Sequence, residues 1–192
     1  MDFIWENVNS VTIIFGLFII LTIILLKPVN FQYYWFLFNG IWIHLYLDGT
    51  VGYWQKNEWL FQKYSELDLR YPLQEPTLMT ISAIEFFIMG PLCVWIALRI
   101  KYQNNEILTN YLIGITSAIQ IMGTIFFVAN EWSRNFKDVC QQGCFTYTHS
   151  NIFYFWIFFV AANPVWIIVP FYQIITAYKN LQQKLEAKSK KA

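Results

Sequence analysis

The strongest constraint on the fold is a succession of apolar stretches separated by polar segments. A helix that crosses a bilayer needs roughly 20 mostly apolar residues. Only 13% of the residues are charged and 57% are hydrophobic, whereas an ordinary soluble domain has about 25% charged residues. The sequence therefore predicts an all-α, polytopic membrane protein in which residues 1–192 form a single domain. Its five expected spans cover about residues 11–26 (with a few residues upstream), 31–53, 77–100, 107–130 and 151–178.

Two features between and within these spans have structural consequences. The polar stretch from Gln55 to Pro76 is too long for a simple turn, so we expect a lid or short helices of its own. The Gly90-Pro91 step should kink the third span. The aromatic share of 20% exceeds what interfacial belts require, so rings either line a pocket for a flat apolar ligand or pack against lipid and core.

Lysine and arginine placement predicts the orientation. Five spans put eight of these residues on the side of the C-terminal tail and five on the other, so the basic tail, residues 179–192, should be cytosolic. Lys188 and Lys190 resemble the dilysine retrieval signal of endoplasmic-reticulum membrane proteins, although a lysine run also serves orientation alone. The net charge of +1, without a basic patch, argues against nucleic-acid binding.

The three cysteines fall in two environments. Cys140 and Cys144 lie in the last loop on the side opposite the tail, where a disulfide is permitted. They can bridge if the loop bends at Gly143, and a pair of free thiols is the alternative. Cys93 lies inside a span and is expected in the core.

His44 and Asp48 stand inside the expected second span. On a helix they are one turn apart and share a face. A charged side chain at bilayer depth costs a few kcal/mol, so such residues usually face the bundle interior and mark a functional pathway. The alternative is a structural pair that joins two helices. Glu85, near the middle of the third span, is a further intramembrane carboxylate.

Several motifs follow one another along the chain: the run His44-Leu-Tyr-Leu-Asp48-Gly, the loop pair Tyr64 and Tyr71, the step Gly90-Pro91-Leu92, Gln120-Ile-Met-Gly123, and the stretch Phe153–Pro170. In order and spacing this set resembles the emopamil-binding protein family, which contains the sterol Δ8-Δ7 isomerases of the EXPERA group. The resemblance implies a five-helix membrane bundle with an intramembrane cavity for the sterol.

The family's sterol-site residues can be carried over by motif. They fall on His44, Asp48, Tyr64, Tyr71, Glu131, Asn163 and Trp166.

Two positions depart from the family pattern. The second-span carboxylate is usually glutamate and is Asp48 here. The third-span glutamate falls on Ser82, whereas this chain has its carboxylate at Glu85, about 4.5 Å further along the helix and on a similar face. Glu85 stands six residues before Pro91, which resembles a non-isomerase branch similar to the sigma-2 receptor, as does the sequence from Gln74 to Pro76.

The chemistry implied is a shift of a ring double bond. It requires adding a proton at one carbon and removing one nearby, in a dry pocket that protects a carbocation. His44 beside Asp48 is expected as an imidazolium acid, Trp166 could stabilise the cation, and Asn163 could orient a neighbour. The expected catalytic residues are His44, Asp48, Glu85 and Glu131, and the expected substrate-binding residues are Tyr64, Tyr71, Ser82, Asn163 and Trp166.

Two functions follow. The first is an endoplasmic-reticulum sterol isomerase with no metal or other cofactor, because no Cys/His cluster has ligand spacing and no glycine-rich loop would hold a nucleotide. The alternative is a non-catalytic sterol-binding or trafficking protein of the same group. Cationic amphiphilic drugs, which resemble the carbocation, are expected ligands. The sequence leaves the preferred sterol and the formation of a homodimer open.

Overall fold

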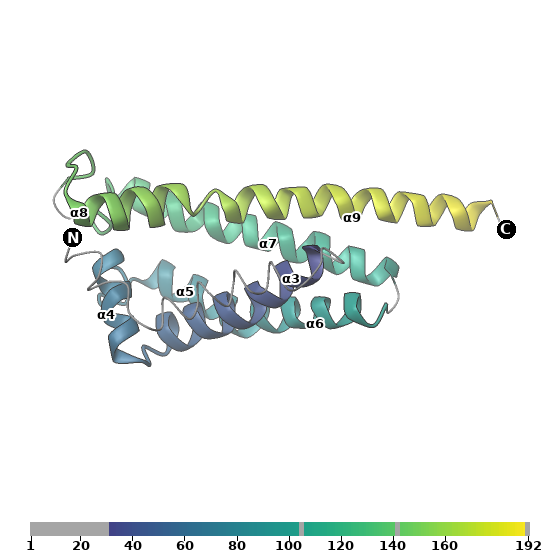
Figure 1. Cartoon of the computed structure of the whole chain (residues 1–192), viewed down its shortest axis with the longest axis horizontal. Coiled ribbons are helices and arrows are strands. Elements are labelled where there is room, and N and C mark those ends of the chain that lie inside the picture. Colours follow the sequence, from purple (N-terminus) through teal and green to yellow (C-terminus); the bar gives the residue numbers. More distant parts are fainter. Residues whose placement is uncertain (1–30, 104–105, 141–142, 191–192) are drawn as a thin grey trace. The chain divides into compact units, whose positions relative to one another are not determined.

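The computed structural model describes residues 31–103, 106–140 and 143–190, and the expected first span lies outside them. The compact unit that begins at Gln32 is built from helices, and the described ranges contain no strand. The elements labelled η have the wider turns of a π-helix. In chain order (Figure 1) the helices are α3 (Phe31–Phe38), η1 (Asn39–Tyr53), α4 (Glu58–Leu67), α5 (Pro76–Ile84), η2 (Glu85–Met89), α6 (Gly90–Lys101), α7 (Glu106–Ser133), α8 (His149–Asn151), η3 (Ile152–Ala161) and α9 (Val165–Ser189).

Within the described ranges, three helical segments are long and apolar enough to cross a membrane. They are Pro76–Lys101, Glu106–Ser133 and His149–Ala187, which agree with the expected third, fourth and fifth spans. The expected second span is also helical throughout, from Phe31 to Tyr53, but it is not among these three. Its buried polar residues, which include Asn39 and His44, lower its mean hydropathy. Its crossing of the membrane, and with it the count of five spans, stays a prediction.

The expected kink near Gly90-Pro91 takes the form of a change in helical turn. The wide turns of η2 end at Met89, two residues before Pro91. Proline lacks an N–H and cannot complete a regular helical ladder, so a local change of hydrogen-bond register is the usual result. A similar change separates η3 from α9 at Asn163 and Pro164.

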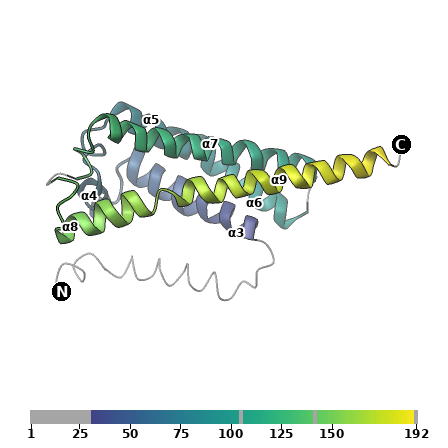
Figure 2. The same ribbon diagram turned by 90° about the horizontal axis from the view of Figure 1, so that it is seen from above.

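Helices α7 and α9 run side by side in opposite directions (Figures 1 and 2). Asn180 Nδ2 donates to Asn110 Oδ1 over 3.1 Å, and Lys184 forms an ion pair with Glu106. Because α9 continues to Ser189, the expected end of the fifth span at Tyr178 is too early as a helix end. Most of the basic tail is therefore helical.

Close packing of η1 against η2 and α6 depends on two glycines. A Cβ atom on Gly40 would lie 2.9 Å from the backbone nitrogen of Val94, and one on Gly49 would lie 1.8 Å from Phe86 Cδ2. A larger residue at either position would push the helices apart. The nearby core includes Cys93 as expected, together with Phe36, Ile96, Ala97, Ile113 and Ala177.

The segment between the second and third spans contains a helix, as expected for so long a connection. Helix α4 begins at an Asn57 cap, whose side chain accepts a hydrogen bond from the Leu60 N–H over 3.3 Å. Its Glu66 accepts a 2.7 Å hydrogen bond from the hydroxyl of Tyr154 in η3. This contact joins the segment to the start of the fifth span.

The last loop contains a disulfide between Cys140 and Cys144, whose Cα atoms are 5.0 Å apart. Gly143 has a φ of +90°, a value that favours glycine, so the loop bends where the sequence suggested. The bridged alternative is the one that the structure contains.

Candidate functional site

Three ionisable residues form what we call the central cluster: His44 and Asp48 from η1, and Glu85 from the start of η2. Their ligand atoms all lie within 4.8 Å of one another. His44 Nδ1 lies 3.0 Å from Asp48 Oδ2, and a carboxylate oxygen of Glu85 lies within 4.8 Å of both side chains. The close approach of η1 to η2 at Gly49 brings the two carboxyl groups together.

The two expected loop tyrosines lie beside this cluster. Their rings are in edge contact, with centroids 5.0 Å apart. Burial, followed by the nearby Asp48 and Glu85 carboxylates, raises the pKa of Tyr64 well above its usual range. Burial and the same negative surroundings raise the pKa of Tyr71. Both hydroxyls are therefore neutral hydrogen-bond donors at physiological pH.

Ser82 faces the end of η1 rather than the solvent or lipid. It is 1% exposed, and its Oγ lies 3.4 Å from where a Cβ atom on Gly52 would be. Tyr71 Cε1 lies 3.1 Å from the same Cβ position on Gly52. The second helix, the loop and the third helix thus bring Ser82 and Tyr71 together, and their expected role in substrate binding stays a prediction.

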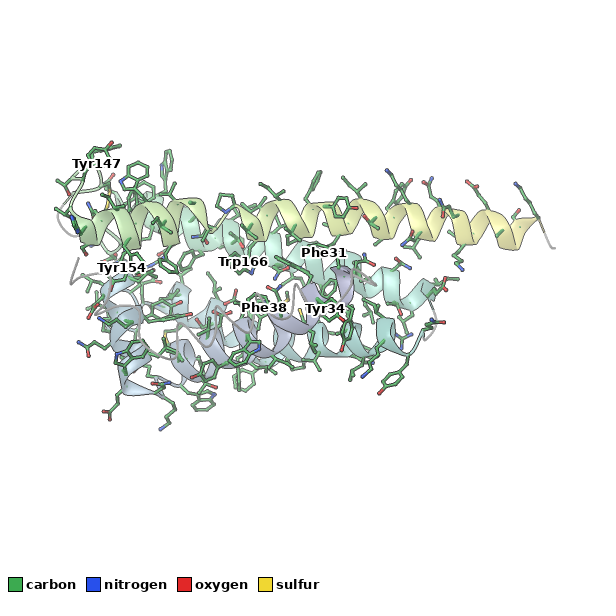
Figure 3. All side chains as sticks on the ribbon, viewed as in Figure 1. Phe31, Tyr34, Phe38, Tyr147, Tyr154 and Trp166 are labelled. Carbon is green, nitrogen blue, oxygen red and sulfur yellow. A yellow bond between two sulfur atoms is a disulfide. The ribbon has the colours of Figure 1, made fainter. Side chains whose placement is uncertain are left out.

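The two expected residues of the fifth span make different contacts. Trp166 lies at the start of α9 (Figure 3), and its indole N–H donates to Asn39 Oδ1 over 2.9 Å. Asn163 Nδ2 donates to the Phe159 carbonyl of its own helix over 2.6 Å, just before Pro164 interrupts the ladder. This bond stabilises the helix break, and the expected orienting role of Asn163 stays a prediction.

Asn39 and Gln120 were not expected in the site. Gln120 Nε2 lies 3.0 Å from Asn39 Oδ1 and 3.4 Å from His44 Nε2. The two amides therefore connect Trp166 to His44 across α9, η1 and α7. Their polar character inside apolar spans was the available signal, but a sequence does not indicate that side chains from separate helices meet.

Glu131 belongs to a second group of charges, which we call the Arg70 cluster. Arg70 Nη2 lies 2.6 Å from Asp68 Oδ2, and Arg70 Nε lies 3.2 Å from Glu131 Oε1. Arg134 pairs with Asp138 over 2.6 Å and lies 3.7 Å from Glu131. Arg70 also lies over the Phe127 ring, 4.3 Å from its centroid. The polar contacts of Glu131 are with this cluster, and its expected catalytic role stays a prediction.

The central cluster offers three ligand atoms of the kinds that bind divalent metals. Both ring nitrogens of His44 already face hydrogen-bond partners, Asp48 and Gln120, so a metal would have to displace one of these contacts. The donor set fits proton exchange better than metal binding. The expected sterol cavity also stays a prediction. A depression that the structure contains is lined by Phe87, Ile88, Pro91, Leu92 and Trp95, and includes none of the expected site residues.

The described residues thus define a helical protein with three segments long and apolar enough to cross a membrane and with ionisable side chains packed between its helices. This chain belongs to the EXPERA family, the expanded EBP superfamily, whose description it matches over residues 57–177. The matched range includes Tyr64, Tyr71, Glu85 and Trp166, and the run from His44 to Asp48 precedes it.

Curated relatives carry the name 3-beta-hydroxysteroid-Delta(8),Delta(7)-isomerase. One from Rattus norvegicus is 24% identical over 147 residues, which cover 72% of this chain and 60% of the relative. One from Cavia porcellus is 23% identical over 155 residues, covering 79% and 63%. A probable isomerase from Oryza sativa subsp. japonica is 22% identical over 160 residues, covering 77% and 65%. The chain thus spans about three fifths of the length of these relatives.

Proposed function

We propose that the protein is a sterol Δ8-Δ7 isomerase. The observation that carries the proposal is the position of Glu85, whose carboxyl group lies within 4.8 Å of Asp48 and His44. By motif the family carboxylate falls on Ser82, so the sequence alone left the third-span carboxylate in doubt. Glu85 lies about one helical turn after Ser82, and its carboxyl group in the central cluster supports the same chemistry as a carboxyl group at position 82.

The reaction moves a double bond by one position. A proton adds to one carbon of the Δ8 double bond, a carbocation forms at its neighbour, and a proton then leaves the carbon on the other side. Two neighbouring carboxyl groups suit this reaction when one of them is protonated, because the pair then offers a proton to donate and a basic oxygen to receive one. Trp166 would stabilise the cation through its ring face, and the neutral hydroxyls of Tyr64 and Tyr71 would contact substrate.

A second candidate function is non-catalytic sterol binding or trafficking. Ser82 favours it, as does the spacing of Glu85 and Pro91, which resembles the sigma-2-receptor branch. On this alternative the central cluster binds an amine or a sterol without proton exchange. Binding of cationic amphiphilic drugs fits both functions, since a protonated amine is attracted to carboxylates, and so does not distinguish them.

The test is to express the protein in cells that lack their own Δ8-Δ7 isomerase and to analyse the sterols by mass spectrometry. We expect Δ8-sterols to be converted to Δ7-sterols. Persistent Δ8-sterols in cells with well-expressed, membrane-inserted protein would overturn the isomerase proposal and favour the binding alternative.

We further propose location in the endoplasmic-reticulum membrane with residues 179–192 in the cytosol. An N-glycosylation acceptor inserted near Glu66 should then be glycosylated, and one inserted in the tail should not. The reverse pattern would invert the topology and remove the retrieval signal. A homodimer would be tested by cross-linking in membranes.

A further inference from the structure

A continuous set of hydrogen bonds runs from Trp166 to His44 through two buried amides. We call it the amide relay: Trp166, Asn39, Gln120 and His44. Its bonds measure 2.9, 3.0 and 3.4 Å from the indole to the imidazole. Asn39, Gln120 and His44 are 0%, 5% and 1% exposed, so bulk water does not compete for these contacts.

The direction of the relay is determined at Asn39. The indole N–H of Trp166 can only donate, so it requires the amide oxygen of Asn39. The amide nitrogen of Asn39 lies 2.8 Å from the backbone carbonyl of Trp35, which can only accept. Turning the Asn39 amide by 180° would place two donors against each other and two acceptors against each other. Its orientation is therefore unambiguous.

The orientation of the Gln120 side-chain amide follows from that of Asn39. The Asn39 oxygen also contacts Gln120, so the Gln120 atom that faces it must be the donating nitrogen. This nitrogen is also the atom that faces His44 Nε2. An amide nitrogen has no lone pair to accept with, so His44 Nε2 must be the acceptor and carries no proton. The proton of the neutral ring is then on Nδ1, which donates to Asp48 over 3.0 Å.

We propose that Asn39 and Gln120 are positioning residues that hold His44 as a neutral imidazole protonated on Nδ1. The proposal deepens the proposed function and, in its catalytic consequence, rests on it. His44 would orient Asp48, and the transferable proton would belong to the Asp48 and Glu85 pair. This differs from the sequence-based expectation that His44 is an imidazolium acid.

Accessibility agrees with this division of roles. The side chain of His44 is 2% exposed and that of Asp48 is 14% exposed, so a ligand reaches the carboxyl group more easily than the ring. The titratable groups around His44 are Asp48, Glu85, Tyr64 and Tyr71. Helices α7 and α9 contribute the Gln120 amide and the Trp166 indole, neither of which titrates.

The experiment is nitrogen NMR of protein labelled with ¹⁵N-histidine in detergent or nanodiscs, purified without a histidine tag. The chain has two histidines, so His149→Gln leaves His44 as the single signal. The two ring nitrogens and their couplings distinguish the two neutral tautomers from the imidazolium. We expect the Nδ1-protonated neutral form at pH 7. An imidazolium or an Nε2-protonated ring would overturn the proposal.

Three variants then test the relay. Gln120→Glu replaces the donor by a carboxylate and should raise the pH at which His44 becomes imidazolium by about 1 to 3 units. Asn39→Leu frees the Gln120 amide to turn and should shift this midpoint in the same direction. Gln173→Leu removes another buried amide, which pairs with Gln32 outside the relay, and should leave the midpoint unchanged.

Unchanged midpoints in both Gln120→Glu and Asn39→Leu would overturn the positioning role. If a relay variant does not fold, the spectrum of the His149→Gln protein still decides the tautomer. No sterol is present in this measurement. A chain that shows the expected tautomer but no sterol conversion would therefore contradict the isomerase proposal and leave the relay intact.

Discussion

Two groups of ionisable residues among the described ranges differ in whether their carboxyl groups have a cationic partner. In the Arg70 cluster, Asp68, Glu131 and Asp138 each lie within ion-pair distance of Arg70 or Arg134. In the central cluster, two carboxyl groups meet a histidine, and no lysine or arginine of the described residues forms an ion pair with them. Every carboxyl group of the Arg70 cluster thus has a guanidinium partner, and the two of the central cluster have none within the part of the chain that the structure describes.

The difference in charge pairing suggests different roles for the two clusters. Arg70 donates to the carboxylate of Asp68 and to the Phe127 carbonyl over 3.0 Å, so it joins the loop after α4 to α7. Such a network stabilises one arrangement of helices. Two carboxyl groups without a cation are costly at bilayer depth, and they are suited to proton exchange or to a cationic ligand. We therefore assign the chemistry to the central cluster and the joining of helices to the Arg70 cluster.

The largest expected effect is loss of turnover in Asp48→Asn. The amide keeps the side-chain volume and loses proton exchange, so sterol conversion should fall by roughly 10²- to 10⁴-fold. Conversion is measured by mass spectrometry at matched levels of folded protein. Glu66→Gln, which changes a partly exposed carboxylate on α4, is the control and should convert sterol normally. Normal conversion by Asp48→Asn would remove Asp48 from the catalytic residues.

The next largest effect concerns stability. Arg70→Met leaves Asp68 and Glu131 buried without their shared cation, which should lower the free energy of unfolding by about 3 to 5 kcal/mol. Thermal unfolding in detergent measures the change. Arg134→Met is the matched control: its side chain is 28% exposed, so the loss should be much smaller. Equal losses of unfolding free energy in Arg70→Met and Arg134→Met would contradict the conclusion that Arg70 is the main cation of this cluster.

A smaller effect is expected at the disulfide. Cys140 and Cys144 close a short loop, so replacing both with serine should cost about 2 kcal/mol or less. Cys140 packs with Phe155 and Phe159 beside the Arg70 cluster, and sterol conversion per folded molecule should not change. The measurement combines thermal unfolding with the sterol assay. A folded but inactive double variant would show that the loop takes part in the chemistry.

The helices could be predicted from the sequence because apolar length is a local property. The ranges of the third and fourth spans agree with the structure to within a few residues. The end of the fifth helix was missed because residues 179–189 are polar enough to leave the membrane and still good enough helix formers to continue α9. The π-type turns of η1 and η2 were not predicted either, since these turns depend on packing against neighbouring helices rather than on composition.

The contact between His44 and Asp48 was predictable because the two residues are one helical turn apart in the sequence. Contacts between distant segments were not predicted. Asn39 and Gln120 are 81 positions apart and share a buried hydrogen bond. Glu131 shows the reverse case: its motif points to the sterol site, and its polar contacts are with Arg70 and Arg134. Sequence motifs indicate which polar residues lie within apolar helices, and the fold determines which side chains they contact.

The most direct test compares Glu85→Gln with Glu131→Gln in cells that lack Δ8-Δ7 isomerase. Both variants replace a buried or partly buried carboxyl group by an amide, one in each cluster. At matched levels of folded protein, we predict that Glu85→Gln leaves Δ8-sterols unconverted and that Glu131→Gln converts them at close to the rate of the unmodified chain. Normal conversion by Glu85→Gln together with none by Glu131→Gln would contradict the assignment of chemistry to the central cluster.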